Sequence, residues 1–430
     1  MIGSSLKNAW KVNDLRKKIG YTLFMLIVVY RIGAHVPVPF INHDTLAQSI
    51  GTGNLVDYFD TFAGGAFKRM SVFALGITPY ITASIIMQLL TIVIPKLERL
   101  SKEGDYGKKQ ITQYTRYATV VFAFISAYGL IFGVLRNSLI IPSPGMEWLV
   151  YLIVAIVLTA GTAFLMWLGE SITEKGIGNG ISLIIFAGIV SRLPDALKGL
   201  YDLKKVGEIS AFSILTLAII TVAVIAGVVF VQEGQRRIPV QYAKRVVGRR
   251  VYGGQSSHIP LKVNQAGVIP IIFAISLVAL PGTIASWFPA TSGFRQFADR
   301  WLTMNGTASS IPIMIFYALL IVFFTYFYTA ITFNPMDVAD NLKKYGGFIP
   351  GLRPGRPTAE YISKVLSRIT LAGGLFLALI AVMPTGIVGL TGLNIAIGGT
   401  SLLIVVGVAL DTMKQIESQL TMRHYQGFMR

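Results

Sequence analysis

The chain has 430 residues, of which 53% are hydrophobic and only 13% are charged, and its mean hydropathy is +0.63. A soluble domain is about one-quarter charged, so this composition indicates an integral membrane protein. The net charge is +18, and the absence of cysteine excludes disulfides, thiolate metal sites and cysteine nucleophiles.

Ten apolar runs approach the ~20 residues that a helix needs to cross a bilayer. They lie at about 19–36, 72–94, 117–135, 148–168, 177–190, 212–231, 266–287, 311–333, 369–388 and 395–413. The fifth run is short and begins with the glycine-rich stretch GIGNGIS. No cleavable signal is expected at the N-terminus, because the first run is long and no small-residue cleavage site follows it. The sequence therefore predicts an all-α polytopic membrane protein with ten transmembrane helices.

The distribution of lysine and arginine predicts the orientation, because these residues resist translocation. With the N-terminus inside, the predicted inner segments hold 28 of the 38 basic residues and the predicted outer loops hold 9. Both termini are therefore expected on the cytoplasmic side. Ten spans also divide into two sets of five, whose orientations must be opposite, as in inverted-repeat channels and transporters. We place the halves at 1–205 and 206–430 on topology alone, since the two show no visible sequence similarity.

A short stretch before the second run, FAGGAFKRMSVFALG at 62–76, is too short and too polar to cross a bilayer. It contains an adjacent pair of glycines, a lysine and an arginine. Pro79 lacks an amide hydrogen and cannot continue the helical ladder behind it. Together with Gly76, Pro79 is expected to separate this stretch from the following helix, which makes the stretch a detached half-helix.

The second and fifth runs carry regularly spaced isoleucines. Thr78, Ile81, Ile85 and Gln88 fall on one side of the second run, and a lipid-facing stripe would not need the threonine and the glutamine. In the fifth run Ile181 and Ile185 follow the GIGNG turn, where glycines allow close backbone approach. Isoleucine pairs in membrane helices ordinarily serve packing or lipid contact, so the spacing alone assigns them no role.

Two long basic loops, at about 232–263 and 334–367, are predicted on the cytoplasmic side. In the first, RIPVQYA alternates apolar and polar residues and Gly248 is available for a turn, which predicts a hairpin projecting into the cytosol. One interpretation is that the loops only set topology and lie against anionic headgroups. The other is that they dock a polyanionic or acidic partner, such as ribosomal RNA or the surface of an ATPase.

Several kinds of chemistry have no motif in this chain. It contains no phosphate-binding G-x-x-x-x-G-K-[ST] loop, no H-E-x-x-H helix and no G-x-S-x-G elbow. The four histidines are scattered and are expected to be loop or interface side chains. Ionisable residues in the apolar runs are few, namely Arg31, with Glu170 and Asp411 near helix ends. This scarcity counts against an ion-coupled transporter, which ordinarily places acids near mid-membrane.

Five segments closely resemble the SecY family, the channel subunits of the bacterial protein translocase, and they occur in family order. They are GITPYITASIIMQLL, WLGESITEKGIGNGISLIIFAGIV, QRRIPVQYAKRVVGRRVYGGQSSHIPLKVNQAGVIPIIFA, ADNLKKYGGFIPGLRPGRPT and GGTSLLIVVGVALDTMKQIESQL. The resemblance extends from about residue 13 to residue 430. It implies two five-helix halves clamped around an hourglass pore, an outer half-helix that plugs the pore, and a sideways opening between the second and seventh helices.

The resemblance also implies roles for particular residues. The plug would span about 57–70 and include Phe62, Gly64, Gly65 and Phe67, with Lys68 and Arg69 keeping its end in water. The pore ring would comprise Ile81, Ile85, Ile181, Ile185, Ile272 and Ile404. The motor or ribosome would dock on Arg236, Arg237, Lys244, Arg245, Arg249, Arg250, Arg353 and Arg356. The lateral gate would include Gln88 and Ser276.

The function implied by the resemblance is a protein-conducting channel and not an enzyme. It would translocate unfolded preproteins and release transmembrane segments sideways into lipid, driven by a partner ATPase or by the ribosome. Expected partners are SecE, SecG, the SecA ATPase, ribosomes, signal-bearing preproteins and membrane lipid, with no cofactor and no direct nucleotide binding. The expected location is the bacterial cytoplasmic membrane. The alternatives are a secondary transporter with inverted repeats and a receptor or insertase scaffold without a pore.

Overall fold

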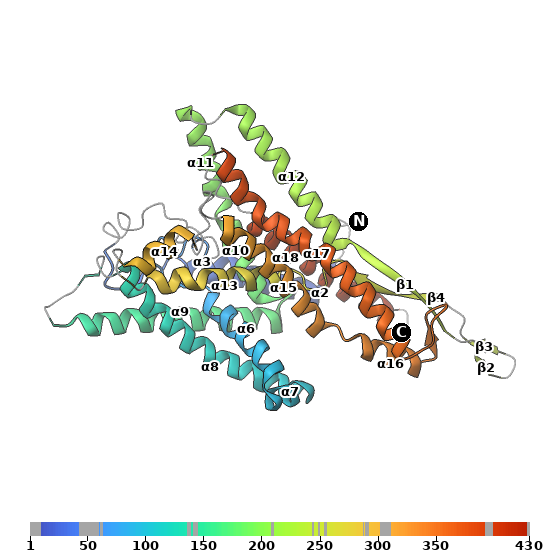
Figure 1. The fold of residues 1–430 in the computed structure, drawn as a ribbon. Coiled ribbons are helices and arrows are strands. Elements are labelled where there is room, and N and C mark those ends of the chain that lie inside the picture. Colours follow the sequence, from blue (N-terminus) through green and yellow to red (C-terminus); the bar gives the residue numbers. More distant parts are fainter. Residues whose placement is uncertain are drawn as a thin grey trace.

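A computed structural model of the chain describes residues 10–42, 60, 63–135, 139–140, 145–207, 210–242, 245–247, 250–252, 256–286, 288, 292–301, 311–391 and 399–427. These residues form mainly helices, and a helix overlaps each of the ten predicted apolar runs (Figure 1). The prediction of an all-α polytopic membrane protein is therefore confirmed. By length and composition alone, five described helices are suited to cross a membrane, or six if one bent pair counts as a single span. The number of ten spans stays a prediction.

The first part of the chain builds one group of helices. The first helix consists of α2, the π-helical segment η1 and α3 in direct succession. The group is made of α2 (Asn13–Phe24), η1 (Met25–Tyr30), α3 (Arg31–Gly33), α6 (Thr78–Val93), α7 (Pro95–Lys102), α8 (Asp105–Leu130), η2 (Ile131–Leu135), α9 (Glu147–Lys175), α10 (Gly180–Ser191) and α11 (Leu193–Val206). α8 packs against α6 and α9, and α9 packs against α10. α6 and α7 meet at Ile94 with a bend of 100°.

The second part builds another group. It is made of α12 (Ala211–Glu233), α13 (Ile269–Ser286), α14 (Gly293–Trp301), α15 (Ile311–Thr332), α16 (Pro335–Lys344), α17 (Arg356–Thr391) and α18 (Gly399–Gly427). α15 packs between α13 and α17, while α18 contacts α12 and α17. The two groups meet where α10 contacts α18 and where α6 and α8 contact α13.

The segment before α6 runs as successive turns from Gly64 onward and not as a regular helix. The expectation of a half-helix is therefore wrong for residues 64–77. The physical reason is backbone geometry, because Gly64, Gly65 and Met70 have φ angles of 65°, 82° and 40°, which interrupt a right-handed helix. The predicted break before the second membrane helix is confirmed. α6 begins at Thr78 with a proline in its first turn, just after Gly76 at a φ of 58°.

The predicted hairpin is also confirmed. β1 (Gln235–Tyr242) pairs antiparallel with β4 (Ser256–Lys262) and with β5 (Gly347–Phe348), and β2 (Arg245–Val247) pairs with β3 (Arg250–Tyr252). The strands extend away from one end of the helical body (Figure 1). The inward face of β1 joins α16 and α17 in a small apolar core formed by Ile238, Val240, Leu261, Leu342, Ile349 and Ile362. This core fixes the basic hairpin to α16 and α17, which come later in the chain, after α13, α14 and α15.

Candidate pore and plug

A large apolar cluster lies where the two groups of helices meet. Its buried members include Ile185 on α10 and Ile404 on α18, each with only 1% of its surface exposed. Ile81 on α6, Ile181 on α10 and Ile272 on α13 are half-buried and pack against the same cluster. Five of the six isoleucines assigned to a pore ring are therefore brought together from four helices that are distant in the sequence.

The sixth isoleucine, Ile85, belongs to a neighbouring cluster. That cluster is built from α12, α13, α15, α17 and α18 and includes Ile271 and Ile275. Ile81 packs against both clusters, so α6 contributes to each of them at positions one helical turn apart. Ile85 therefore packs toward α13 and its neighbours, and not into the cluster that holds the other five isoleucines.

The start of α10 is held tightly, and this sets the position of Ile181. The Asn179 side chain caps the helix by accepting a hydrogen bond from the Ser182 amide at 3.2 Å, and the Gly180 amide donates to Thr173 Oγ1 on α9 at 2.9 Å. A Cβ on Gly169 would lie only 2.3 Å from Cδ1 of Ile181. Glycine at position 169 therefore lets the isoleucine lie directly against α9.

The segment before α6 fills the same apolar cluster. Its side chains Ala63, Ala66, Phe67 and Met70 are buried there together with Ile185 and Ile404. Phe67 thus lies in the apolar surroundings that a plug requires. The companion residue Phe62 lies outside the described residues.

Polar contacts tie this segment to the junction of α10 and α11. The side chain of Asp60 is 1% exposed, and its Oδ2 lies 3.3 Å from Nη2 of Arg192. The other carboxylate oxygen accepts a hydrogen bond from the Lys68 amide at 3.0 Å, and the Asp60 carbonyl accepts one from the Gly65 amide at 3.1 Å. One buried carboxylate therefore orders the turns of the segment and also pairs with a cation on the adjacent helix.

Gly64 allows the segment before α6 to lie very close to the backbone of α10. A Cβ on this residue would lie 3.0 Å from Gly188 Cα, and the Gly64 backbone has a φ of 65°. The Gly64 carbonyl accepts a hydrogen bond from Arg69 Nη2 at 3.0 Å, with the Ser191 hydroxyl 3.5 Å away. Lys68 is exposed as expected, but Arg69 is half-buried and folds back onto the segment. The expectation that Arg69 keeps this end in water is wrong, because the guanidinium bonds the segment's own backbone.

The two residues assigned to the lateral gate lie on neighbouring helices, since α6 packs against α13. Both are half-buried, and each bonds within its own helix. Gln88 Nε2 lies 3.4 Å from Ser84 Oγ, and the Ser276 hydroxyl donates to the Ile272 carbonyl at 2.8 Å. In the described part of the chain no hydrogen bond joins Gln88 to Ser276. The contact between α6 and α13 is carried by apolar side chains, among them Ile85.

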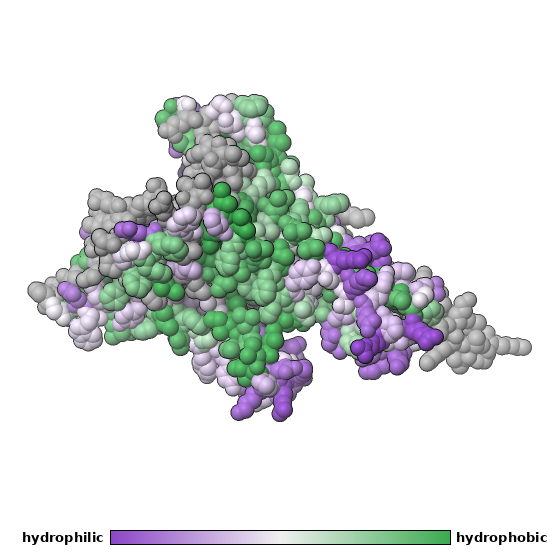
Figure 2. All heavy atoms as spheres, in the orientation of Figure 1, coloured by the Kyte–Doolittle hydropathy of each residue, from purple (hydrophilic) through white to green (hydrophobic). Residues whose placement is uncertain are grey.

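The arginines assigned to docking lie on the strand-bearing end of the molecule. Arg236 and Arg237 on β1, together with Arg353 and Arg356 near the start of α17, are exposed. The Arg356 guanidinium forms a 3.3 Å ion pair with Glu360, and both side chains remain largely in solvent. Figure 2 shows hydrophilic residues gathered over this end and over α7, with hydrophobic residues covering the helical body between them. Lys244 and Arg249 lie outside the described residues, and Arg245 and Arg250 are described only as backbone in β2 and β3.

The site is almost entirely apolar where the helices converge. Among the described residues, no three His, Asp or Glu side chains are grouped so that they could hold a metal ion. Sequence reasoning missed Asp60, Arg192 and Ser191. Asp60 and Arg192 are 132 positions apart, and no local pattern marks them as partners. The arrangement offers a cluster of aliphatic side chains and, beside it, a polar contact that joins the segment before α6 to the start of α11.

Comparison with known proteins places the chain among protein translocase subunits. The SecY family model matches residues 71–413. The chain is 50% identical to protein translocase subunit SecY of Halalkalibacterium halodurans, over 99% of each chain. It is 48% identical to the protein of the same name from Bacillus subtilis, also over 99% of each chain.

Solved structures share the fold at lower sequence identity. A structure described as a protein-conducting channel superposes with a TM-score of 0.67 at 20% identity, covering 94% of this chain and 92% of the other. A second structure, Sec61 in the canine ribosome-channel complex from the endoplasmic reticulum, gives a TM-score of 0.62 at 19% identity, with the same coverage. These matches establish a common helical architecture over nearly the whole chain.

Proposed function

This chain belongs to the SecY family of protein translocase subunits, and from that premise we propose that its central apolar cluster is the constriction of a protein-conducting channel. The ring consists of Ile81, Ile85, Ile181, Ile185, Ile272 and Ile404. The observation that carries the proposal is that five of these side chains, drawn from α6, α10, α13 and α18, pack into one cluster. The two halves, 1–205 and 206–430, enclose this constriction with opposite orientations in the membrane. The protein is a channel subunit and not an enzyme.

A ring of branched aliphatic side chains suits the transport of polypeptide. Such side chains cannot replace the hydration shell of an ion, and a narrow apolar neck closes by dewetting. An unfolded chain passing through the ring meets no hydrogen-bonding groups that must be broken at each step. The same ring therefore blocks small ions while it lets diverse side chains pass.

The segment from about 57 to 70 is the proposed plug. Its support is the shared burial of Phe67, Ala66 and Met70 with the ring residues, together with the polar contacts of Asp60 and Gly64 to the end of α10. Gly64 and Gly65 allow the tight turns that seat the segment. Displacement of these turns opens the constriction, and their return seals it.

Sideways release into lipid takes place between α6 and α13, with Gln88 and Ser276 on the two sides of the seam. The apolar contact supports this, since Ile85 packs with residues of α13 and the seam carries no hydrogen bond between the two assigned residues. A substrate segment at the open seam partitions by hydrophobicity. It gains ~0.3 to 0.6 kcal/mol for each central Leu or Phe and loses ~2.5 to 3.5 for each Lys or Asp.

The strand-bearing end faces the cytoplasm, as do both chain termini, and the membrane is the bacterial inner membrane. The exposed Arg236, Arg237, Arg353 and Arg356 support docking of an acidic or polyanionic partner there. The proposed partners are the ribosome and the SecA ATPase, which drive transport, and SecE and SecG, which complete the channel. Ribosome binding is also consistent with the structurally similar Sec61, which was solved in a ribosome-channel complex.

The direct test is reconstitution of the chain with SecE in proteoliposomes, followed by addition of SecA, ATP and a signal-bearing preprotein. The expected result is protease-protected preprotein that depends on ATP and on the signal. A tight, saturable small-molecule site or ion-coupled flux in the same vesicles would instead indicate a secondary transporter. Absence of ion conductance after deletion of residues 57–70 would indicate a scaffold without a pore.

A further inference from the structure

The short helix α14 (Gly293–Trp301) has a distinct apolar side that the channel function does not use. It follows α13 at the end of the helical body opposite to the strands (Figure 1). Helical spacing gathers Phe294, Phe297, Ala298 and Trp301 within one sector of its circumference, and polar residues fill most of the remainder. α14 is therefore an amphipathic helix outside the predicted membrane spans.

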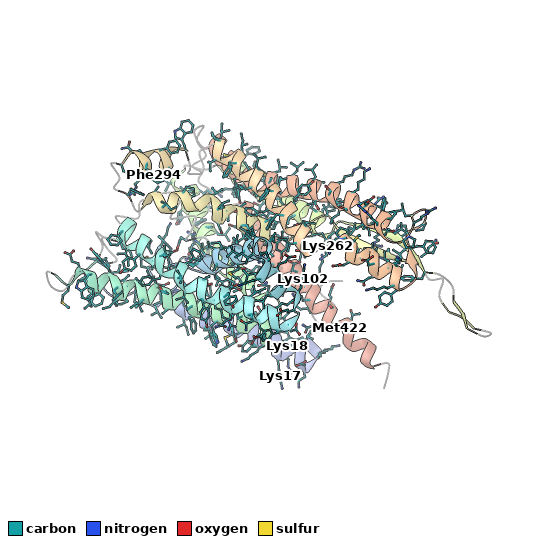
Figure 3. All side chains as sticks on the ribbon, turned by 60° about the horizontal axis from the view of Figure 1, so that its bottom comes forward. Lys17, Lys18, Lys102, Lys262, Phe294 and Met422 are labelled. Carbon is teal, nitrogen blue, oxygen red and sulfur yellow. The ribbon has the colours of Figure 1, made fainter. Side chains whose placement is uncertain are left out.

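Only part of that apolar sector is covered by the protein. Ala298 is fully buried, and the Arg295 guanidinium donates a hydrogen bond to the Phe288 carbonyl at 3.1 Å, which holds α14 against the end of α13. The aromatic residues Phe294, Phe297 and Trp301 remain 45%, 54% and 41% exposed. Figure 3 shows Phe294 well away from the labelled Lys17, Lys18, Lys102 and Lys262.

The exposed aromatic side continues the outer surface of α13. Leu277 and Ile284 are exposed and, seven residues apart, share one face of α13. Phe288 follows the helix, and its ring meets that of Phe294 edge to face with a centroid distance of 5.4 Å. An apolar strip therefore passes from the predicted seventh membrane helix onto α14. With α13 in the membrane as predicted, its exposed face contacts lipid, and the same lipid reaches the aromatic side of α14.

We propose that α14 is an interfacial anchor that binds the phospholipid surface at the end of α13. Phe294, Phe297 and Trp301 lie at the boundary between acyl chains and headgroups, and the polar side faces water. Aromatic residues favour this depth, and amphipathic helices lie in the plane of the interface with their apolar side buried. The anchor fixes the depth of one end of α13. The inference requires only that the chain spans a membrane and does not depend on transport of polypeptide.

The test uses the full chain, with its partner subunits, reconstituted in phosphatidylcholine nanodiscs. Trp301 is kept as the only tryptophan by replacing Trp10, Trp148, Trp167 and Trp287 with Phe. Its fluorescence is measured in lipids brominated near the headgroup or near the acyl terminus, and with acrylamide added to the water. The expected result is strong quenching by the shallow bromines, weaker quenching by the deep bromines, and protection from acrylamide.

Matched variants separate lipid binding from folding. Phe297→Gln is expected to lower the quenching by shallow bromines and raise the quenching by acrylamide, while Gln296→Ala, on the polar side, leaves both unchanged. Quenching of Trp301 by acrylamide alone would overturn the proposal, because the helix would then lie in water. Protection from both quenchers would overturn it too, because a protein and not lipid would cover α14. Ion conductance of each variant shows separately whether the channel itself is intact.

Discussion

The ion pair between Asp60 and Arg192 is expected to hold the proposed plug, residues 57–70, in its closed position. The Asp60 carboxylate is almost fully buried at 3.3 Å from the Arg192 guanidinium. If the plug moves as proposed, the two residues separate. Asp60→Asn removes the charge but keeps an oxygen that can accept the bond from the Lys68 amide. The substitution therefore isolates the ionic contact from the local turn geometry.

The magnitude follows from what a partly buried ion pair contributes, since Asp60 Oδ2 faces the Arg192 guanidinium at 3.3 Å without a hydrogen bond to a described residue. An exposed ion pair contributes up to about 1 kcal/mol, and removing one partner of a fully buried pair costs about 3 to 5 kcal/mol, so we take about 1.5 to 3 kcal/mol for this intermediate case. At about 1.4 kcal/mol for each factor of ten, losing the pair shifts the ratio of seated to displaced plug by roughly 10- to 150-fold. Arg192→Gln is expected to act in the same direction, with the added penalty of leaving a buried carboxylate without its cation.

The assay is the open probability of single channels in planar bilayers, for Asp60→Asn, Arg192→Gln and the double variant. If the two residues act as a pair, the double variant opens no more often than the more active single variant, which is the signature of coupling in a double-mutant cycle. Lys198→Gln on α11 serves as the control, because it removes the same charge from an exposed nearby site. Strictly additive effects of the two substitutions, or wild-type gating in all three variants, would refute the idea that this ion pair holds the proposed plug closed.

Three further predictions concern other parts of the molecule. Ile404→Asn places an amide in the buried cluster, so ion leak through planar bilayers should rise, and unchanged conductance would contradict the seal. Arg353→Glu should weaken binding of ribosomes and of SecA in sedimentation assays, and the defect should become smaller as salt screens the charge. Wild-type binding by this variant would instead indicate that Arg353 only helps to set the orientation of the chain in the membrane. Glu170→Gln removes the anion that accepts from Arg116 Nε at 3.0 Å and lies 2.8 Å from its Nη2, across α8 and α9. Because the pair is partly exposed, its removal should lower the free energy of unfolding by only about 1 kcal/mol, measured as a small fall in Tm. An unchanged Tm would show that the pair contributes nothing to stability.

Local chemistry explains which features the sequence predicted well. The long apolar runs predicted where helices lie along the chain. Pro79 and Gly76 marked the start of α6, because a proline without an amide hydrogen and a glycine with a positive φ act on the backbone next to them. Alternation in RIPVQYA predicted the β-hairpin for the same reason, since strand periodicity is a property of consecutive residues. The half-helix before α6 was wrong for residues 64–77, where positive φ angles at Gly64, Gly65 and Met70 interrupt a helix. At Gly64 the turn lies against Gly188 on α10, a neighbour that the adjacent sequence does not indicate.

By itself, the sequence determined the class of molecule, where its apolar helices lie along the chain and, through resemblance, its family. The tertiary structure alone decided which side chains meet. Isoleucines from α6, α10, α13 and α18 converge, and Asp60 pairs with Arg192, because helix packing brings together residues that are far apart in the sequence. Periodicity constrains only the face of each helix, whereas the neighbour of that face depends on how all the helices pack at once.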